Sequence, residues 1–246
     1  MDNGIKVLIV IPTYNENESI NDLCLEILEN ENNWNVLVVD DGSTDGTDLK
    51  VLELSIKYIN RIDLLQRGKK MGVGSAHIDG INWGIQKRYD FIVTMDADGT
   101  HETKSISSFL EKCNYYDICV GSRYMAPNSL AGWTLWRKTL TYFVHNLTKL
   151  TLGLNFDNSS GFRAYSVKAL VDVDMKAIES ANYDFFFESL LYFKKIGLQI
   201  SETPISLPKR TAGHSKLTLR LAISALKTLM KLIFKHRIFN HEYKKI

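Results

Sequence analysis

The feature that most constrains how this chain can fold is an alternation of apolar runs and helical patterns through its first half. Four strand-like segments lie at residues 6–12, 35–40, 61–67 and 90–96, and the first is a continuous apolar run, which is typical of a central parallel strand buried on both faces. Three segments between them favour helices, and they lie at about 15–30, 44–59 and 74–87. Strand–helix–strand repeats build parallel sheets through right-handed crossovers. The sequence therefore predicts an α/β fold with a Rossmann-like, mostly parallel sheet and helices on both faces.

Acidic turns follow three of the predicted strands. The chain reads PTYNEN after the first strand, DDGSTDG after the second and DADGTHE after the fourth. Ligands bind outside the carboxyl ends of the strands in such sheets, so these turns should meet at one edge. Good turn and helix-capping chemistry could explain any one of them alone. Three together indicate a site that binds a cation and, through it, an anionic ligand, because unpaired carboxylates beside a core are costly.

The sharpest of these turns contains the D-x-D triplet of Asp96 and Asp98. Alternation of side chains along an extended segment sends both carboxylates to the same side. Mg²⁺ or Mn²⁺ prefers one or two carboxylates together with substrate phosphates and water. We therefore expect a divalent metal here, and we expect His101 to be an ordinary residue at the start of the following helix.

Two other nucleotide-binding classes fit the chain poorly. The glycine cluster GVGSAH at 72–77 lacks the Gly or Ala that ends a GxGxxG motif, and it does not follow the first strand, so a dinucleotide-dependent oxidoreductase is disfavoured. The sequence also has no GxxxxGK[ST] phosphate loop. A nucleic-acid binder is disfavoured because aromatic and basic residues are not interleaved as a stacking groove requires.

The net charge of +2 conceals a strong asymmetry. Residues 209–246 contain ten Lys and Arg against the single acid Glu242, a balance of +9, which leaves −7 for the rest of the chain. This division predicts an acidic catalytic body and a basic tail for an anionic partner. The three cysteines form no CxxC pair and favour a reducing, cytoplasmic compartment. The apolar run near the start is expected to be a strand and not a targeting segment.

Six motifs point to a known family. VIPTYNENESI, VVDDGSTDGT, MDADGTHE, GSRY, SSGFRAYS and RTAGHSKL occur in this order between residues 10 and 217. In this the chain resembles family 2 glycosyltransferases of the GT-A fold. The last three motifs resemble more closely the polyprenyl-phosphate glycosyltransferases, a group that includes dolichol-phosphate mannosyltransferase. The resemblance covers roughly residues 6–220 and implies a catalytic domain over 1–216.

The resemblance also implies roles for individual residues around a nucleotide sugar. The nucleobase and ribose pocket would be lined by Pro12, Tyr14, Glu16, Val39 and Asp41, with Asp40 bracing the turn. The ribose and diphosphate would be approached by Asp96, Ala97 and Asp98.

The metal and the phosphates have their own candidates by the same resemblance. The metal candidates are Asp96, Asp98 and Thr100, of which Asp98 is the better ligand. Thr100 stands where the family often carries Gln or Ser. Phosphate clamping would come from Arg123, Arg210 and Lys216. Arginine suits this role through its planar fork and lysine as a point charge.

The implied reaction is transfer of a sugar, with inversion, to a polyprenyl or dolichyl phosphate. GDP-mannose is the favoured donor and UDP-glucose its main rival. A lipid phosphate is already ionised, so no strong general base is needed and none is assigned. A soluble family 2 transferase acting on a glycan or protein stays open, as does a non-catalytic nucleotide-binding subunit.

The basic tail suggests how such an enzyme would meet its lipid. Within the basic segment 217–246, residues 217–236 carry four cations (Arg220, Lys227, Lys231 and Lys235) on one stripe of a predicted helix. Leu226, Leu229, Met230 and Ile233 contribute to its broad apolar face. A second amphipathic candidate lies at 133–150. We expect peripheral attachment to the cytosolic face of a membrane, or recruitment of a small membrane-anchoring subunit. The alternative is a tail helix that packs on the body or on a partner.

Overall fold

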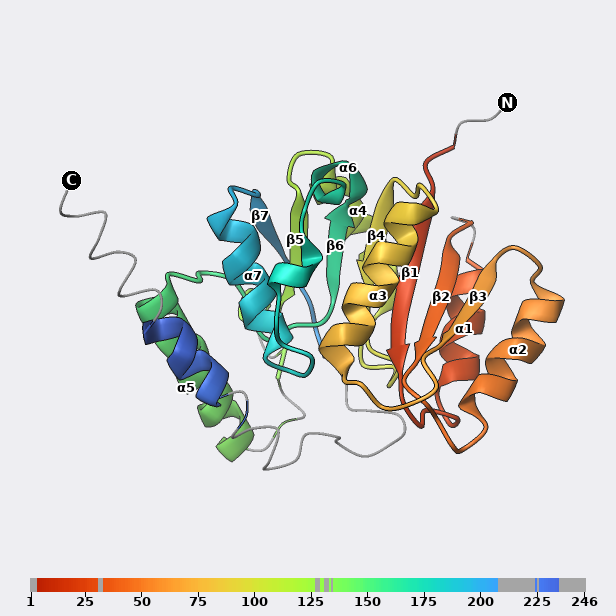
Figure 1. The fold of residues 1–246 in the computed structure, drawn as a ribbon, viewed down its shortest axis with the longest axis horizontal. Helices are drawn as coiled ribbons and strands as arrows, with labels where there is room; N and C mark the ends of the chain where they lie inside the picture. Colours follow the sequence, from red (N-terminus) through yellow and green to blue (C-terminus); the bar gives the residue numbers. More distant parts are fainter. Residues whose placement is uncertain are drawn as a thin grey trace.

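The computed structural model describes residues 4–30, 33–126, 129–130, 133, 135–207, 224 and 226–234. Its described strands form one seven-stranded sheet in the order β3-β2-β1-β4-β6-β5-β7 (Figure 1). Their bounds are β1 (Val7–Thr13), β2 (Asn35–Asp40), β3 (Ile62–Gln66), β4 (Phe91–Thr94), β5 (Ile118–Ser122), β6 (Arg163–Ser166) and β7 (Ile200–Pro204). All neighbours pair in parallel except β6, which is antiparallel to both β4 and β5. The predicted mostly parallel sheet is confirmed.

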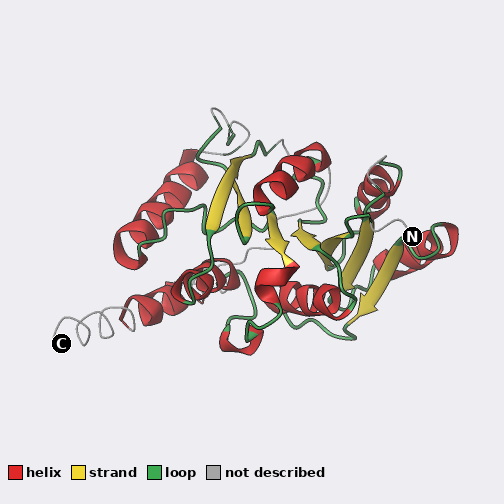
Figure 2. Ribbon diagram, turned by 90° about the horizontal axis from the view of Figure 1, so that it is seen from above, coloured by secondary structure: helices red, strands yellow, loops and turns green. Residues whose placement is uncertain are grey.

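Helices lie on both sides of this sheet (Figure 2). Their bounds are α1 (Ile20–Leu28), α2 (Thr47–Lys57), α3 (Val73–Gln86), α4 (Ile106–Cys113), α5 (Leu135–Leu152), α6 (Val167–Leu170) and α7 (Phe185–Lys195). The predicted helix at 44–59 is shorter in the structure because its N-cap, Gly46, adopts a left-handed conformation with φ of 86°. The predicted helix at 15–30 begins only at Ile20, since the preceding residues form a turn that packs against the loop after β2.

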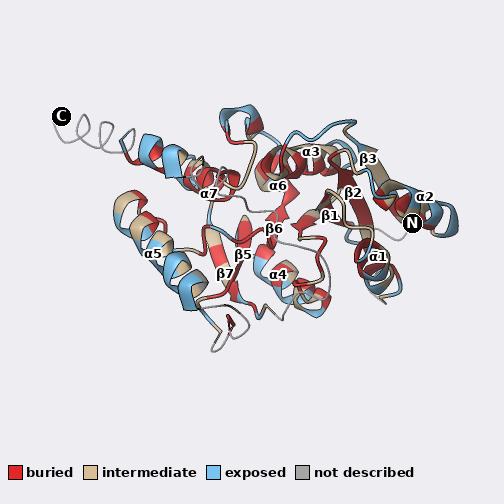
Figure 3. Cartoon of the chain, turned by 90° about the horizontal axis from the view of Figure 1, so that it is seen from below, coloured by how far each residue is buried: buried red, intermediate tan, exposed pale blue. Residues whose placement is uncertain are grey.

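Alternate residues of β1 explain why the sheet is buried on both faces. Leu8 and Val10 pack into the cluster under α3 and α7, whereas Ile9 and Ile11 pack into the cluster under α1 and α4. Figure 3 shows the strands as buried and the outer sides of the helices as exposed. A continuous apolar run is therefore what this central strand requires.

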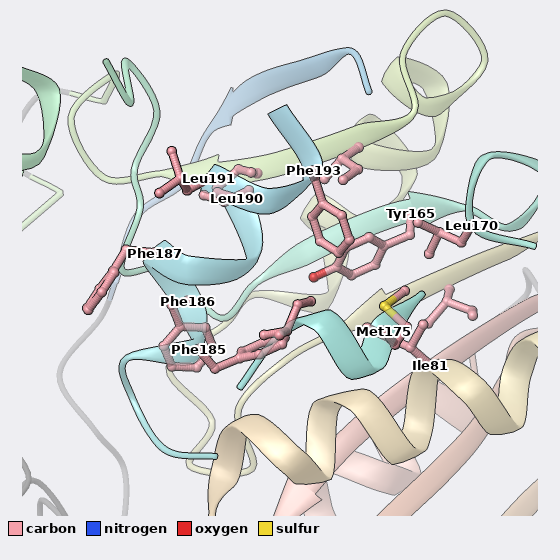
Figure 4. Packing of buried hydrophobic residues seen from close by; sticks show 14 of the residues in the cluster. Ile81, Tyr165, Leu170, Met175, Phe185, Phe186, Phe187, Leu190, Leu191 and Phe193 are labelled. Carbon is pink, nitrogen blue, oxygen red and sulfur yellow. The ribbon is translucent and has the colours of Figure 1, made fainter. Parts of the chain in front are cut away.

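The cluster under α3 and α7 combines aliphatic side chains with a group of aromatic ones from α7 and β6. Phe185, Phe193 and Tyr165 lie between α7 and the sheet (Figure 4). On the α3 side, a Cβ at Gly80 would lie 2.3 Å from Val10 Cγ1, so only glycine permits this close approach of helix to strand. The packing fixes α3, and with it the loop at its N-terminus, against the carboxyl ends of β1 and β2.

The described part of the basic tail is a helix, residues 226–234, that packs on the body. Leu229, Leu232 and Ile233 are buried in the cluster under α7. These residues contribute to the core, as expected for the alternative of a tail helix that packs on the body. Leu226 and Met230 do lie exposed. Within the described residues, no helix combines the length and hydropathy needed to cross a bilayer.

Candidate active site

The turns after β1 and β2 are joined to one another at the carboxyl edge of the sheet. The Asn15 backbone N–H donates to Ser43 Oγ at 2.8 Å, and the Thr44 N–H donates to Asn15 Oδ1 at 2.8 Å. The Glu16 N–H donates to Thr47 Oγ1 at 3.0 Å. These reciprocal bonds bring the predicted nucleotide-binding residues of both turns into one wall of a common site.

Asp40 and Asp41 have different roles in the second turn. The Asp40 carboxylate accepts hydrogen bonds from the N–H groups of Gly42 and Ser43, at 3.1 and 3.0 Å, and from the Ser43 hydroxyl. The predicted role of Asp40 as a brace of this turn is confirmed. The desolvation cost of a carboxylate at the end of a buried strand is thus offset by hydrogen bonds from the turn.

Asp41 is bonded to the loop after β3. Its carboxylate accepts from Arg67 Nη1, Met71 N–H and Gly72 N–H, each at 2.8 Å. Arg67 also lies 3.0 Å from Asp79 of α3. Three of the roughly four acceptor positions of the Asp41 carboxylate are therefore used within the protein. Its direct contact with a nucleotide stays a prediction, and Arg67 is a residue that the motif analysis missed.

The D-x-D turn places its two carboxylates in different environments. Asp98 is buried, and its Oδ1 accepts from the Thr100 N–H at 3.1 Å and the Thr100 hydroxyl at 2.6 Å. The Asp96 side chain is 42% exposed. Thr100 therefore lies next to the predicted metal ligand and holds it in place. The described residues contain no group of three or more His, Cys, Asp or Glu side chains close enough to hold a metal.

Two further segments close around this turn. His101 precedes the short 3₁₀ helix Thr103–Ser105 and braces the turn instead of beginning that helix: its Nδ1 accepts from the Asp96 N–H at 3.0 Å. From the SSGFRAYS motif, Gly161 approaches so closely that a Cβ there would lie 3.1 Å from Asp96 Oδ1. The D-x-D turn and the motif that resembles polyprenyl-phosphate transferases thus form one surface.

Arg163 of the same motif has a purely internal environment. Its guanidinium is fully buried and donates to the carbonyls of Ser160 and Phe186 and to Ser189 Oγ, at 2.7 to 2.9 Å. These bonds tie β6 to α7. Burial lowers the pKa of Arg163, although the nearby Tyr165 opposes the shift.

Arg123 follows β5 and is paired with Asp157. Nε and Nη2 donate to the two carboxylate oxygens at 2.7 and 2.6 Å, and Nη2 also contacts Ser159 Oγ at 2.5 Å. Burial alone would lower the pKa of Arg123, but the Asp157 charge outweighs it and raises that pKa. Nη1 is the guanidinium nitrogen that Asp157 and Ser159 do not engage. Contact with a phosphate stays a prediction for Arg123, and Asp157 is a second residue that the motifs missed.

The remaining predicted site residues fall into three groups. Pro12, Tyr14 and Glu16 are partly exposed along the first turn, as a ligand contact requires. Val39 and Ala97 are buried, so a nucleotide could reach only their main chains. Arg210 and Lys216 lie outside the described residues, and their roles stay predictions.

Comparison with known sequences identifies close relatives. Residues 8–173 match the protein family described as Glycosyl transferase family 2. The chain is 35% identical over 219 residues to undecaprenyl-phosphate mannosyltransferase of Micrococcus luteus, covering 87% of this chain and 88% of that protein. It is 32% identical over 215 residues to polyprenol monophosphomannose synthase of Mycolicibacterium smegmatis, covering 87% of this chain and 81% of that protein.

Solved structures share the fold at lower sequence identity. Glucosyl-3-phosphoglycerate synthase of Mycobacterium tuberculosis, in complex with Mn²⁺, UDP-glucose and phosphoglyceric acid, matches with a TM-score of 0.64 and 16% identity, over 94% of this chain and 80% of that chain. The same synthase with Mg²⁺ and UDP matches with a TM-score of 0.62 and 16% identity, over 93% and 79%. The predicted GT-A fold is confirmed.

Proposed function

The chain belongs to glycosyltransferase family 2, and on that premise we propose that it transfers mannose from GDP-mannose, with inversion, to a polyprenyl phosphate. Two relatives that span most of the chain carry names of polyprenyl-phosphate mannose transfer. The structural observation that carries the proposal is the approach of Gly161 to Asp96. The D-x-D turn is expected to hold the donor, and the SSGFRAYS motif resembles those of transferases that use lipid-phosphate acceptors. The contact places the two side by side.

The donor diphosphate would be held through a divalent metal on Asp96 and Asp98. Two carboxylates together with diphosphate oxygens and water form a suitable oxygen ligand set for Mg²⁺ or Mn²⁺. The fold neighbours crystallised with Mn²⁺ or Mg²⁺ support this choice. When bound, the ion would neutralise charge on the leaving nucleotide. Thr100 keeps the Asp98 carboxylate oriented through its two hydrogen bonds.

The protein itself would supply the remaining phosphate contacts. Arg123, Arg210 and Lys216 are the candidates for neutralising the donor and acceptor phosphates. Asp157 keeps the Arg123 guanidinium in a fixed plane, so that Nη1 is presented without a search over rotamers. Because the acceptor phosphate is ionised, these cations orient and stabilise an existing nucleophile instead of creating one.

The acceptor is a lipid, and the surface offers a place to meet it. On α5, Trp136 and Phe143 are 75% and 63% exposed, and Leu135, Leu140 and Leu150 are exposed as well. The exposed Leu226, Met230 and Phe234 of the 226–234 helix lie at the same end of the molecule as α5 (Figure 1). We propose that this end contacts the cytosolic face of a membrane or a small anchoring subunit.

A donor and acceptor panel tests the proposal. Purified protein is incubated with Mn²⁺, a radiolabelled nucleotide sugar and a polyprenyl phosphate, and the product is partitioned between organic solvent and water. We expect label in the organic phase with GDP-mannose and less with UDP-glucose. Transfer from UDP-glucose and not from GDP-mannose would show that the donor is UDP-glucose. Label that enters only water-soluble glycan or protein would replace the acceptor assignment.

A further inference from the structure

A lysine outside the recognised motifs lies on the predicted nucleobase pocket. The ammonium of Lys70 is 3.6 Å from the centroid of the Tyr14 ring, which is within the range of a cation–π contact. Lys70 belongs to the loop between β3 and α3, and its side chain is exposed. Tyr14 belongs to the turn after β1, so two distant segments place a cation on an aromatic ring at the carboxyl edge of the sheet.

The loop that carries Lys70 is fixed on both sides of this residue. Asp41 accepts from the N–H groups of Met71 and Gly72, directly after Lys70. Directly before it, Lys69 packs against Gly42: a Cβ at Gly42, whose φ is 79°, would lie 2.9 Å from Lys69 Cα. The Lys70 backbone is therefore held against the turn after β2, while its long side chain keeps its freedom.

We propose that Lys70 is a specificity-determining residue that recognises the base of the bound nucleotide. A base that stacks on Tyr14 takes the place of the ammonium on the ring. The flexible lysine stem then lets the ammonium donate to a keto oxygen at the edge of that base. Asp41 acts in the same step as a positioning residue, because it fixes the loop from which Lys70 reaches. The inference rests on the proposed nucleotide-sugar donor and names a residue that selects its base.

The chemistry of the bases makes this selection testable. Guanine and uracil present a keto oxygen where adenine presents an amino group, which cannot accept from an ammonium. A charge-assisted hydrogen bond to the keto oxygen should therefore favour GDP and UDP over ADP. Because Lys70 is exposed, we expect about a tenfold effect, at the low end for hydrogen bonds to charged groups.

The test measures dissociation constants by calorimetry for GDP, UDP and ADP with Mn²⁺ and the full chain. Lys70→Ala should raise the dissociation constants of GDP and UDP about tenfold and leave that of ADP unchanged. The variant would then have lost the preference for keto bases. Lys70→Arg should retain most of that preference, because it keeps a charged donor. Lys69→Ala is the matched control, since it removes a neighbouring exposed cation and should change none of the three constants.

The possible outcomes separate this inference from the function on which it rests. Equal weakening of all three nucleotides by Lys70→Ala would assign the lysine to the diphosphate and overturn base recognition. Unchanged binding would overturn the inference and leave the proposed donor intact. If the wild-type protein binds neither GDP nor UDP in the presence of Mn²⁺, the nucleotide-sugar function itself fails.

Discussion

Arg123 and Asp157 form a buried two-point ion pair, in which each carboxylate oxygen accepts from a different guanidinium nitrogen. Asp157 Oδ2 also accepts from the Arg123 backbone N–H at 3.0 Å. The pair joins the turn after β5 to the loop before β6. The pair therefore both positions the Arg123 guanidinium and links two loops of the fold.

Removing one member of this pair should be costly. Asp157→Asn leaves the Arg123 charge buried without its partner, so we expect a loss of about 3 kcal/mol in the free energy of unfolding. Urea denaturation measures the loss. Asp172→Asn changes an exposed carboxylate of the same type and should remain within about 0.5 kcal/mol of wild type. A loss below about 1 kcal/mol for Asp157→Asn would mean that the pair is not an important stabilising contact.

The same pair predicts a pH dependence. Burial raises the pKa of Asp157, but pairing with Arg123 more than offsets this and lowers the pKa below its usual value. The stability contributed by the carboxylate is therefore present above the unfolded-state pKa, near about 3.9, and is lost as pH falls through the lower folded pKa. The difference between wild type and Asp157→Asn should be constant from about pH 6 to 8 and shrink below about pH 4. A difference that grows in acid would contradict the assignment.

His77 should make the fold sensitive to mild acid. It is fully buried against Phe185 and Phe186, and burial, aided by Arg163 and His101, lowers its pKa to about 3. In the unfolded chain His77 binds a proton below about pH 6.5, whereas in the folded protein it stays neutral. The free energy of unfolding therefore decreases as the pH is lowered. Between pH 7 and 5 wild type should lose about 2 kcal/mol more than His77→Leu. Parallel stability curves for the two proteins would contradict this.

The D-x-D turn should be essential to catalysis and not to folding. Asp98→Ala removes the carboxylate proposed as the main metal ligand, so we expect turnover to fall at least about a hundredfold while circular dichroism is unchanged. Removing metal with EDTA should have a similar effect on wild type and little on the variant. Activity within about tenfold of wild type would show that the metal assignment is wrong.

The exposed apolar residues of α5 should anchor the protein to lipid. The double variant Trp136→Ser and Phe143→Ser should sediment less with anionic vesicles, because two large apolar groups no longer enter the interface. Leu49→Ser with Ile56→Ser alters exposed apolar residues of α2 at the opposite end of the molecule and is the control (Figure 1). Equal loss from both double variants would indicate nonspecific hydrophobic adsorption.

The first half of the fold could be predicted because each element carries its own signal. The segments that form β1, β2 and β4 are largely apolar, and an acidic turn follows each of them directly. By contrast, β6 is four residues long and contains Arg163, whose burial depends on acceptors from α7. A strand of this length has no periodicity from which its position between β4 and β5 could be predicted.

The site residues likewise include some that could be predicted from local motifs and some that could not. Asp96, Asp98 and Asp40 stand in local motifs, and their turns could be read from the chain. The partnerships of Asp41 with Arg67 and of Arg123 with Asp157 join residues 26 and 34 positions apart. Such pairs exist only after the sheet has assembled, and a lysine over a ring from another turn is equally invisible in sequence. The choice between a membrane-facing and a body-packed tail helix also depends on tertiary contacts, because the body buries Leu229, Leu232 and Ile233.

We propose that this chain makes a lipid-linked mannose by direct inversion at the sugar carbon. The most direct measurement is the structure of the product formed from GDP-α-mannose and a polyprenyl phosphate, isolated from the organic phase and examined by mass spectrometry and NMR. The account predicts one mannose joined through phosphate to the polyprenol in the β configuration. An α-linked product, a different sugar acceptor or no lipid product would contradict it.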